Sequence, residues 1–362
     1  MTGDEITLLV GGRKYSGWES ARVTRSMESI SGSFALAVSE RWAGQDQSWP
    51  IREGDEVTVQ VNGVPLVTGH LDDRDPEFDA NSGSISITGR DKTGDLVDSS
   101  VLLDHWSFKN FSPLDLAKQI CRPFGISVRL QDGLILPATS LSKKLDIDPG
   151  DKAATALEHV CRAAAVLPMS DGVGGLVLVR SSTARCKTEL VQGKNILSGK
   201  ARFSHANRFH RYLVLGQHKG NDDFSGEDSA AVKGEATDPN VRSSRVLVIR
   251  PEGNLTRAQA QKRAEWEAAH RAARGDAVSV KVQGWTHSTG ALWPINEVTR
   301  VRSARLGING DMLISQATYS ADRIGGRVTE LELRRPGAFQ PQPSVASEGD
   351  GLWKEIRRGS LT

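Results

Sequence analysis

The cysteines are the first residues in this sequence that could carry chemistry, as nucleophiles, disulfide partners or zinc ligands. There are three, Cys121, Cys161 and Cys186, an odd number with no CxxC spacing. Disulfide frameworks and structural zinc sites need cysteines paired at characteristic spacings. Cys121 and Cys161 each lie in an apolar helical pattern, so we interpret them as buried free thiols that pack as small hydrophobic groups. A catalytic cysteine with a remote histidine stays open as the alternative.

Histidines could bind a metal or transfer protons. Among the eight histidines, the closest group is His205, His210 and His218. Spacings of five and eight residues do not place them on one face of a helix. On a strand, His210 and His218 would share a face but lie about 26 Å apart, at roughly 3.3 Å per residue. We therefore interpret them as solvated or locally hydrogen-bonded side chains.

Paired carboxylates could serve as general acids and bases. They occur at Asp72–Asp73, with Asp75 nearby, and at Glu227–Asp228, all in stretches that have the composition of loops. We expect them to be solvated. The acidic run 219–229 also lacks the Glu that ends a calcium-binding EF-hand loop.

The motifs of known catalytic sites are missing. No GxSxG, HExxH or P-loop pattern occurs, and Gly172–Gly175 precedes a strand rather than a helix, which argues against a phosphate cradle. The sequence therefore predicts no catalytic residue, no metal ligand and no cofactor site. We expect a protein that is not an enzyme.

Composition excludes further classes. The 362 residues include 46 Lys and Arg against 44 Asp and Glu, a net charge of +2, whereas a dedicated nucleic-acid binder is expected to show a marked basic excess. No stretch approaches the roughly 18 apolar residues of a spanning helix, and the first residues lack the pattern of a secretory signal. We expect synthesis in a reducing cytoplasm and no membrane insertion.

Residues 1–95 predict a first β-barrel-like domain of short antiparallel strands. The segment Ser33–Val38 alternates, with Phe34, Leu36 and Val38 on one face, and Asn62–Gly63 is a strong hairpin signal. Residues 96–185 predict an α+β domain. Its first helix begins at Ser112–Pro113, and its second runs from Ala153 to about Ala165 with Asp151 as the expected cap.

Residues 186–335 predict a second β-barrel-like domain, with an exposed polar loop near 219–240 and a helix over 256–274. Thr256 is the expected N-cap of this helix, and Gly275 is expected to end it. A stripe of Ala264, Ala268 and Ala272 would let the helix lie close to a sheet. Glu265 and Glu267 interrupt its arginines, which indicates a solvated face rather than a nucleic-acid helix. The predicted fold class is thus α+β and mostly β.

Residues 336–362 have the composition of a flexible C-terminal tail, rich in Pro, Gln, Ser and Gly. Near its end, Leu352, Trp353 and Ile356 form a brief amphipathic segment. Two interpretations stay open, a disordered end and a partner-docking peptide, since an exposed Trp beside Leu and Ile is a typical anchor.

The order of these elements resembles the Mu-like phage tail protein P family, the baseplate hub proteins of the late control protein D superfamily. The resemblance covers about residues 1–335. It is carried by the runs Ile87–Ser100, Phe111–Ile120, Asp148–Leu157, Arg263–Arg274 and Val278–Trp285, of which Gly89–Val97 and the helix with Trp266 are the most specific.

This resemblance implies a homotrimer in which each chain supplies two similar β-barrel domains to a pseudo-sixfold ring. The ring would join a tail tube or tube-initiator protein to a trimeric central spike, and a baseplate wedge or tape-measure protein would be a further partner. The residues after Pro336 are too few for a spike domain, so the spike is expected to be a separate chain. The protein would belong to the virion tail baseplate and assemble in the host cytoplasm.

Passage of genomic DNA through such a ring sets an expectation about charge. Each Lys or Arg contact to phosphate strengthens DNA binding, so we expect basic residues to point outward and the lumen to be neutral or acidic. Two alternative functions are a tail-associated cell-wall hydrolase and a tail-tip receptor- or carbohydrate-binding protein. The latter could stack sugars on tryptophans, but Trp18, Trp266, Trp285 and Trp293 stand in patterned elements that favour packing.

Overall fold

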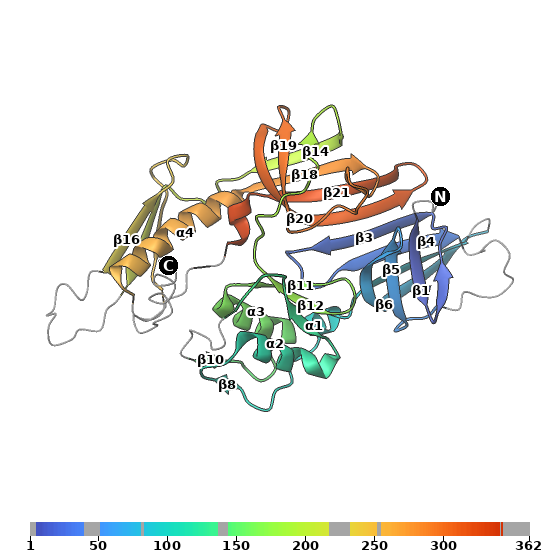
Figure 1. Ribbon diagram of the computed structural model, residues 1–362, viewed down its shortest axis with the longest axis horizontal. Helices are drawn as coiled ribbons and strands as arrows, with labels where there is room; N and C mark the ends of the chain where they lie inside the picture. Colours follow the sequence, from blue (N-terminus) through green and yellow to red (C-terminus); the bar gives the residue numbers. More distant parts are fainter. Residues whose placement is uncertain are drawn as a thin grey trace, which may run out of the picture.

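The computed structural model describes residues 5–39, 51–80, 83–136, 144–216, 232–251, 255–340 and 342. It is mostly β, as predicted, with one large sheet of thirteen strands and three small sheets. Figure 1 shows two β halves side by side, an α+β unit below them, and a long helix with a small sheet extending away on one side. Within this described part, no helix is long and apolar enough to cross a membrane.

The first β half forms where alternating apolar residues were found. Its turns use the residues that favour left-handed backbone, since Asn62 and Gly63 have φ of 52° and 77° in the hairpin between β5 and β6. Leu8, Val59 and Val67 are completely buried inside it. Its strands are β1 (Ile6–Val10), β2 (Arg13–Tyr15), β3 (Ser20–Ser26), β4 (Ser33–Ser39), β5 (Glu56–Val61), β6 (Val64–Phe78) and β7 (Gly83–Asp91).

The second β half shares the same apolar core, in which Val280, Leu331 and Leu333 are fully buried. Its strands are β13 (Leu190–Val191), β14 (Ile196–Phe203), β18 (Asp276–Gln283), β19 (Val298–Ser303), β20 (Ile308–Asp322) and β21 (Gly326–Arg334).

The two halves repeat one strand order. The first runs β3-β4-β7-β6-β5 and the second runs β14-β18-β21-β20-β19. Both contain a fifteen-residue strand, β6 and β20. Each of these strands has a bulge against its hairpin partner, between Leu71 and Asp73 in β6 and between Ile314 and Gln316 in β20. The chain therefore contains two copies of one β unit.

The two β halves are joined edge to edge in one sheet and do not form two separate sheets. Ser20–Ser26 of β3 pairs antiparallel with Gln316–Asp322 of β20, which makes the sheet continuous. Across this seam Thr24 Oγ1 and Thr318 Oγ1 are 3.1 Å apart, and Arg334 donates a 2.9 Å hydrogen bond to Glu28.

The α+β unit packs three helices against a small sheet. Ser112 caps α2 as predicted, because its hydroxyl accepts a hydrogen bond from Asp115 N. The predicted cap of α3 is wrong. Lys152 occupies that position without a side-chain bond, and the Asp151 carboxylate instead accepts from Asp148 N. The elements are α1 (Gly94–Asp98), β8 (Ser107–Phe108), α2 (Pro113–Cys121), η1 (Arg122–Phe124), β9 (Val128–Leu130), β10 (Leu145–Asp146), α3 (Ala153–Ala164), β11 (Leu167–Ser170) and β12 (Leu176–Val179).

The long helix α4 (Arg257–Gly275) covers one face of a sheet made of β16 (Val232–Thr237), β15 (Arg211–Gly216) and β17 (Val246–Ile249). Its N-terminus is a complete capping box between Thr256 and Gln259. Strand β16 occupies part of the predicted polar loop. The loop prediction is therefore wrong for 232–237, while 217–231 lie outside the described residues.

Helix α4 ends at Gly275, as predicted, and this residue is glycine because a Cβ there would lie 2.7 Å from the Ser204 carbonyl oxygen. The predicted stripe of alanines is wrong in part. The small-residue contact uses Ala260 and Ala264, which are fully buried, whereas Ala268 and Ala272 are only half-buried.

The first residues of the predicted flexible tail are ordered. Pro336–Phe339 form the short helix η2, in which Ala338 is buried. The Gln340 carbonyl oxygen then accepts a 3.1 Å hydrogen bond from Trp266 Nε1 on α4. The tail prediction is therefore wrong for 336–340, because this segment packs on α4 and continues the fold.

Candidate assembly interface

Cys121 and Cys161 are buried free thiols, as predicted, and Cys186 is a buried free thiol as well. Burial raises the pKa of Cys121 to about 12 and also raises the pKa values of Cys161 and Cys186. These thiols therefore stay protonated near neutral pH and are poor nucleophiles.

The predicted polar candidates have structural partners. His210 Nδ1 lies 3.0 Å from the Val241 carbonyl oxygen and 3.1 Å from that of Asp238, which is the local bonding expected for it. Asp72, Asp73 and Asp75 stand on strand β6 rather than in a loop, which corrects the prediction. Among the described residues, no three His, Cys, Asp or Glu side chains gather as a metal site.

Several predicted residues lie outside the described part of the chain. They include His218, the pair Glu227–Asp228, and the candidate docking residues Leu352, Trp353 and Ile356. The docking role of these last three stays a prediction.

The run Gly89–Val97 joins the first β half to the α+β unit. A Cβ on Gly89 would lie 2.2 Å from the His70 carbonyl oxygen and 2.6 Å from the Phe34 ring, so only glycine fits. Arg90 then holds Asp72 of β6 at 2.7 Å and Asp98 of α1 at 2.5 Å. The run is therefore a structural junction.

Asp91 is the buried centre of this junction. Its two carboxylate oxygens accept hydrogen bonds from Gly32 N at 2.8 Å and Thr68 N at 2.9 Å. Burial raises its pKa, although these bonds and Ser170 work in the opposite direction. The glycine turn after β11 docks here too, because Thr68 Oγ1 donates to the Gly172 carbonyl oxygen at 3.1 Å.

Helix α4 carries an ion network that the sequence did not predict. Glu267 is only 5% exposed. Its carboxylate accepts from Arg263 at 2.8 Å and from Arg271 at 2.7 Å, one turn to either side. The predicted solvated face is therefore wrong at Glu267. The sequence signal that could have predicted this ion network is the i, i+4 spacing of Arg263, Glu267 and Arg271.

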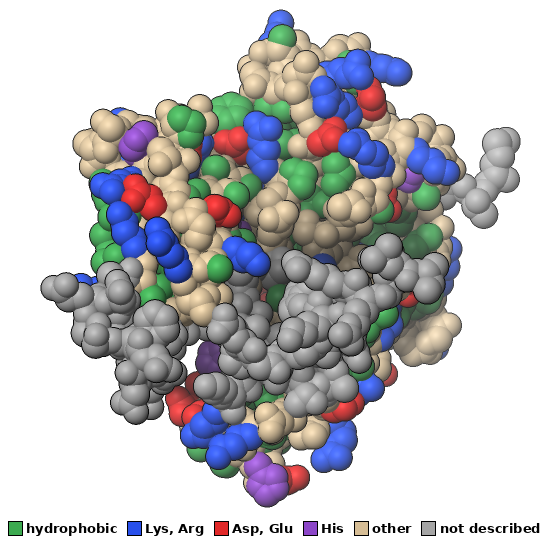
Figure 2. Space-filling view, turned by 60° about the vertical axis from the view of Figure 1, so that its left-hand side comes forward, with side chains coloured by type: hydrophobic (Ala, Val, Ile, Leu, Met, Phe, Trp, Pro, Cys, Tyr) green, Lys and Arg blue, Asp and Glu red, His purple; other side chains and the backbone are tan. Residues whose placement is uncertain are grey.

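A basic groove of about 500 Å³ lies between α4 and the start of the second β half. Five arginines line it, together with Glu267, and the described chain reaches Gln342 at its wall. Figure 2 shows that Lys and Arg side chains on the face displayed are interspersed with Asp and Glu rather than gathered in one patch. The lining arginines are Arg202, Arg208, Arg271, Arg274 and Arg334.

Within the described residues, the sheet has two edges where a long strand lacks a partner on one side. There β14 pairs only with β18, and the second half of β6 pairs only with β7. Apolar side chains are exposed on both: Phe78 is 83% exposed, and Leu197 and Phe203 are 55% and 52% exposed. Exposed strand edges bind other strands readily, so these edges are candidate contact surfaces for another chain.

Comparison with known proteins places this fold in the class of phage tail baseplate proteins. Three domain models match in order: the N-terminal domain of the Mu phage baseplate assembly protein GpP-like family at 5–91, the second domain of the baseplate hub protein gp44-like family at 93–180, and the fourth domain of Mu phage baseplate assembly protein GpP at 256–342.

Relatives narrow the class to one family. The chain is 31% identical to baseplate hub protein gp44 of Escherichia phage Mu over 347 residues, which cover 94% of this chain and 90% of that protein. The chain belongs to the family of Mu-like phage baseplate hub proteins, which confirms the resemblance found in the sequence, and such proteins are located in the virion tail.

Solved structures agree. The 43 kDa tail protein of prophage MuSo2 from Shewanella oneidensis has a TM-score of 0.81 at 31% identity, with 94% of this chain and all 100% of that chain covered. The tail protein from Neisseria meningitidis MC58 shares the fold with a TM-score of 0.78 at 23% identity, with 94% and 99% covered.

Proposed function

We propose that three copies of this baseplate hub protein form a ring with pseudo-sixfold symmetry. One observation carries the proposal: each chain contains the same five-strand order twice. Three chains related by a threefold axis would therefore present six similar β units. Such a ring can contact sixfold components on one side and threefold components on the other, which is what a hub between tube and spike requires.

The partners follow from this geometry. The hub would bind a tail tube or tube-initiator protein on one side and a separate trimeric central spike on the other, with a baseplate wedge or tape-measure protein as a further contact. We propose domains at 1–95, 96–185 and 186–335, with a C-terminal tail whose residues Leu352, Trp353 and Ile356 dock to one of these partners. Assembly would take place in the host cytoplasm.

Passage of DNA is supported by the sheet face that points away from the core. On β4 and β7 this face carries Ser33, Ala35, Ser84, Ser86, Thr88 and Arg90, and the Arg90 charge is paired with Asp72 and Asp98. Its charges are opposed across strands, as where Arg22 lies 3.8 Å from Glu330. A surface with compensated charges attracts phosphate weakly, so this face would suit a neutral lumen.

The hub would act without catalysis. The three thiols are buried, and two of the tryptophans that could stack sugars, Trp285 and Trp293, are only 3% and 4% exposed. Neither the hydrolase nor the carbohydrate-binding alternative is favoured by any feature of the described residues.

The solution mass of the full chain tests the proposal. Light scattering or native mass spectrometry should give three times the mass of one chain, and negative-stain images should show rings. A species that stays monomeric even with tube and spike proteins added would overturn the proposed ring.

A further inference from the structure

We propose that the free edge of β14 in one copy pairs antiparallel with the free second half of β6 in the next copy. This inference rests on the proposed trimer and adds the strands and the residue register that would build it. It treats the contact between copies as a repetition of the β3–β20 seam that each chain already contains.

The internal repeat fixes which strands correspond. The β6–β7 hairpin and the β20–β21 hairpin each have one bulge at the same place. The first paired residue after the bulge is Asp73 in β6 and Gln316 in β20, so these two residues correspond. Strand β4 pairs with β7 in the same way as β18 pairs with β21. Ala37 stands opposite Ser86 and Lys281 stands opposite Glu330, so Ala37 corresponds to Lys281.

The strands at the same end of the two repeated orders, β3 and β14, correspond in the same way. Ser20 of β3 stands opposite Ala37, and Ser198 of β14 stands opposite Lys281. Strand β14 is therefore the counterpart of β3, and the second half of β6 is the counterpart of the β20 segment that β3 pairs with.

These correspondences give a register between copies. The seam inside the chain pairs Thr24 with Thr318 and Arg22 with Ser320. The equivalent contact between copies pairs Arg202 with Asp75 and Lys200 with Glu77. Each pair brings together opposite charges, which stabilise directly opposed positions on neighbouring strands.

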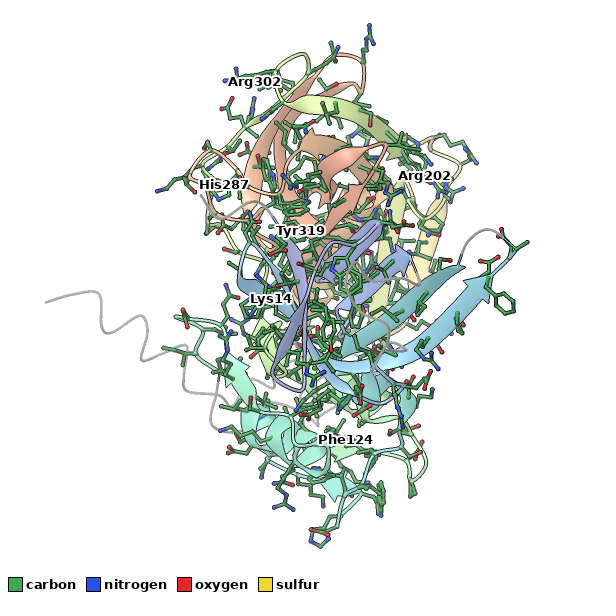
Figure 3. The ribbon with its side chains drawn as sticks, turned by 90° about the vertical axis from the view of Figure 1, so that its right-hand side faces the viewer. Lys14, Phe124, Arg202, His287, Arg302 and Tyr319 are labelled. Atoms are coloured by element: carbon green, nitrogen blue, oxygen red, sulfur yellow. The ribbon has the colours of Figure 1, made fainter. Side chains whose placement is uncertain are left out.

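The charges on the two edges favour this partner. All four side chains are exposed, and within the described residues no ion pair involves any of them. The free half of β6 holds Asp72, Asp73, Asp75 and Glu77 against a single Arg74, whereas β14 holds Lys200 and Arg202 and no acidic residue. Figure 3 shows Arg202 on one half and the light-blue hairpin of β6 and β7 extending from the other.

The opposite face of the same pairing is apolar. Phe78, which is 83% exposed, would stand opposite Gly199. A Cβ on Gly199 would lie 2.9 Å from Leu306 Cδ1, so the Leu306 side chain covers that glycine and offers Phe78 an apolar contact. Pro76 would face Ala201. Because proline has no N–H, the ladder lacks a donor there, and the charged pairs on both sides of Pro76 would set the register.

Disulfide capture tests the register. Two single variants of the full chain, Asp75→Cys and Arg202→Cys, are mixed and oxidised mildly. Directly opposed residues lie within disulfide reach, so the mixture should give a cross-linked dimer that neither variant gives alone. As a register control, Asp75→Cys is mixed with Ser198→Cys, which lies four residues along β14, about 13 Å away, and should not cross-link.

Charge reversal tests the energetic role. Asp75→Arg with Glu77→Lys should weaken association by roughly tenfold or more, and adding Lys200→Glu with Arg202→Asp in the same chain should restore it. Reversal of two exposed acidic residues elsewhere, Asp104→Lys with Asp132→Lys, should leave the mass unchanged.

The outcomes separate the two proposals. A trimer that neither cross-links nor responds to the reversals overturns the edge pairing and leaves the ring intact. Cross-links in the predicted register from a chain that is otherwise monomeric support the pairing and argue against a stable trimer. Monomers without cross-links at high protein concentration, or cross-linking equally strong with the Ser198 control, would overturn the pairing as well.

Discussion

The Arg208 guanidinium donates two hydrogen bonds, of 3.0 Å and 2.8 Å, to a single oxygen of Asp238. Both side chains are buried, 11% and 6% exposed. The pair joins the loop before β15 to the end of β16, and Arg208 also lies against Gly275 at the end of α4. It therefore fixes the outlying sheet relative to the long helix.

Removing one charge of this pair should destabilise the outlying sheet. We expect Asp238→Asn to lower the free energy of unfolding by about 3 kcal/mol, because it leaves Arg208 buried without a counter-charge. Urea unfolding followed by circular dichroism would measure the loss. The matched control is Glu235→Gln on β16, which removes the exposed partner of Arg211 on β15 and should change stability little.

The stability of α4 should depend on pH through Glu267. Burial alone would raise its pKa, but hydrogen bonds from Arg263 and Arg271 outweigh burial, so the pKa in the folded protein is lowered. The Glu267 contribution is therefore present above the usual pKa of 4.5 and is lost as pH falls through the lowered value.

Thermal unfolding between pH 3 and pH 7, compared with that of Glu267→Gln, would reveal this contribution. The wild-type chain should lose stability toward acid more steeply than the variant. Equal slopes would mean that Glu267 gains nothing from its two arginines.

The sequence predicted elements whose signal is local. The alternation in Ser33–Val38 and the Thr256 cap mark β4 and α4 without knowledge of their neighbours. The second half of β6 escaped prediction because its acidic residues and Pro76 have the composition of a loop, and it is a strand only because β7 pairs with it. Strand β16 was missed for the same reason, since it pairs with β15 from beyond a polar segment.

The candidate contact edges could not be read from the sequence either. Their identification needs the strand order, the position of the bulges and the seam between β3 and β20. The seam joins residues nearly 300 positions apart, as Thr24 and Thr318 are. The family resemblance predicted the class of protein and the ring, whereas the register of the edges depends on three-dimensional pairing.

Close approach of backbone makes Gly234 irreplaceable. A Cβ there would lie 2.2 Å from the Ala260 carbonyl carbon and oxygen on α4. We expect Gly234→Ala to lower the unfolding free energy by about 1–3 kcal/mol, since the helix must shift away from the sheet. Gly310→Ala is the control, because the nearest atom to its Cβ would be 3.5 Å away, in the Arg335 side chain. Equal unfolding midpoints for the two variants would contradict this reading of Gly234.

Asp91 should hold the α+β unit on the first β half through acceptor geometry rather than through its charge. Its oxygens accept from Gly32 N and Thr68 N. In Asp91→Asn an amide N–H₂ must replace one acceptor and would face a backbone donor, so we expect a loss of about 1–3 kcal/mol even though a buried charge disappears.

Chemical denaturation and protease susceptibility near the junction would measure this loss. Asp95→Asn, at an exposed position on α1, should stay within about 0.5 kcal/mol of the wild type. Because burial raises the pKa of Asp91 in the folded state, this group favours folding more as pH falls toward its ordinary pKa, opposite in sign to Glu267. A variant as stable as the wild type at pH 7 would show that relief of the buried charge outweighs the lost acceptor.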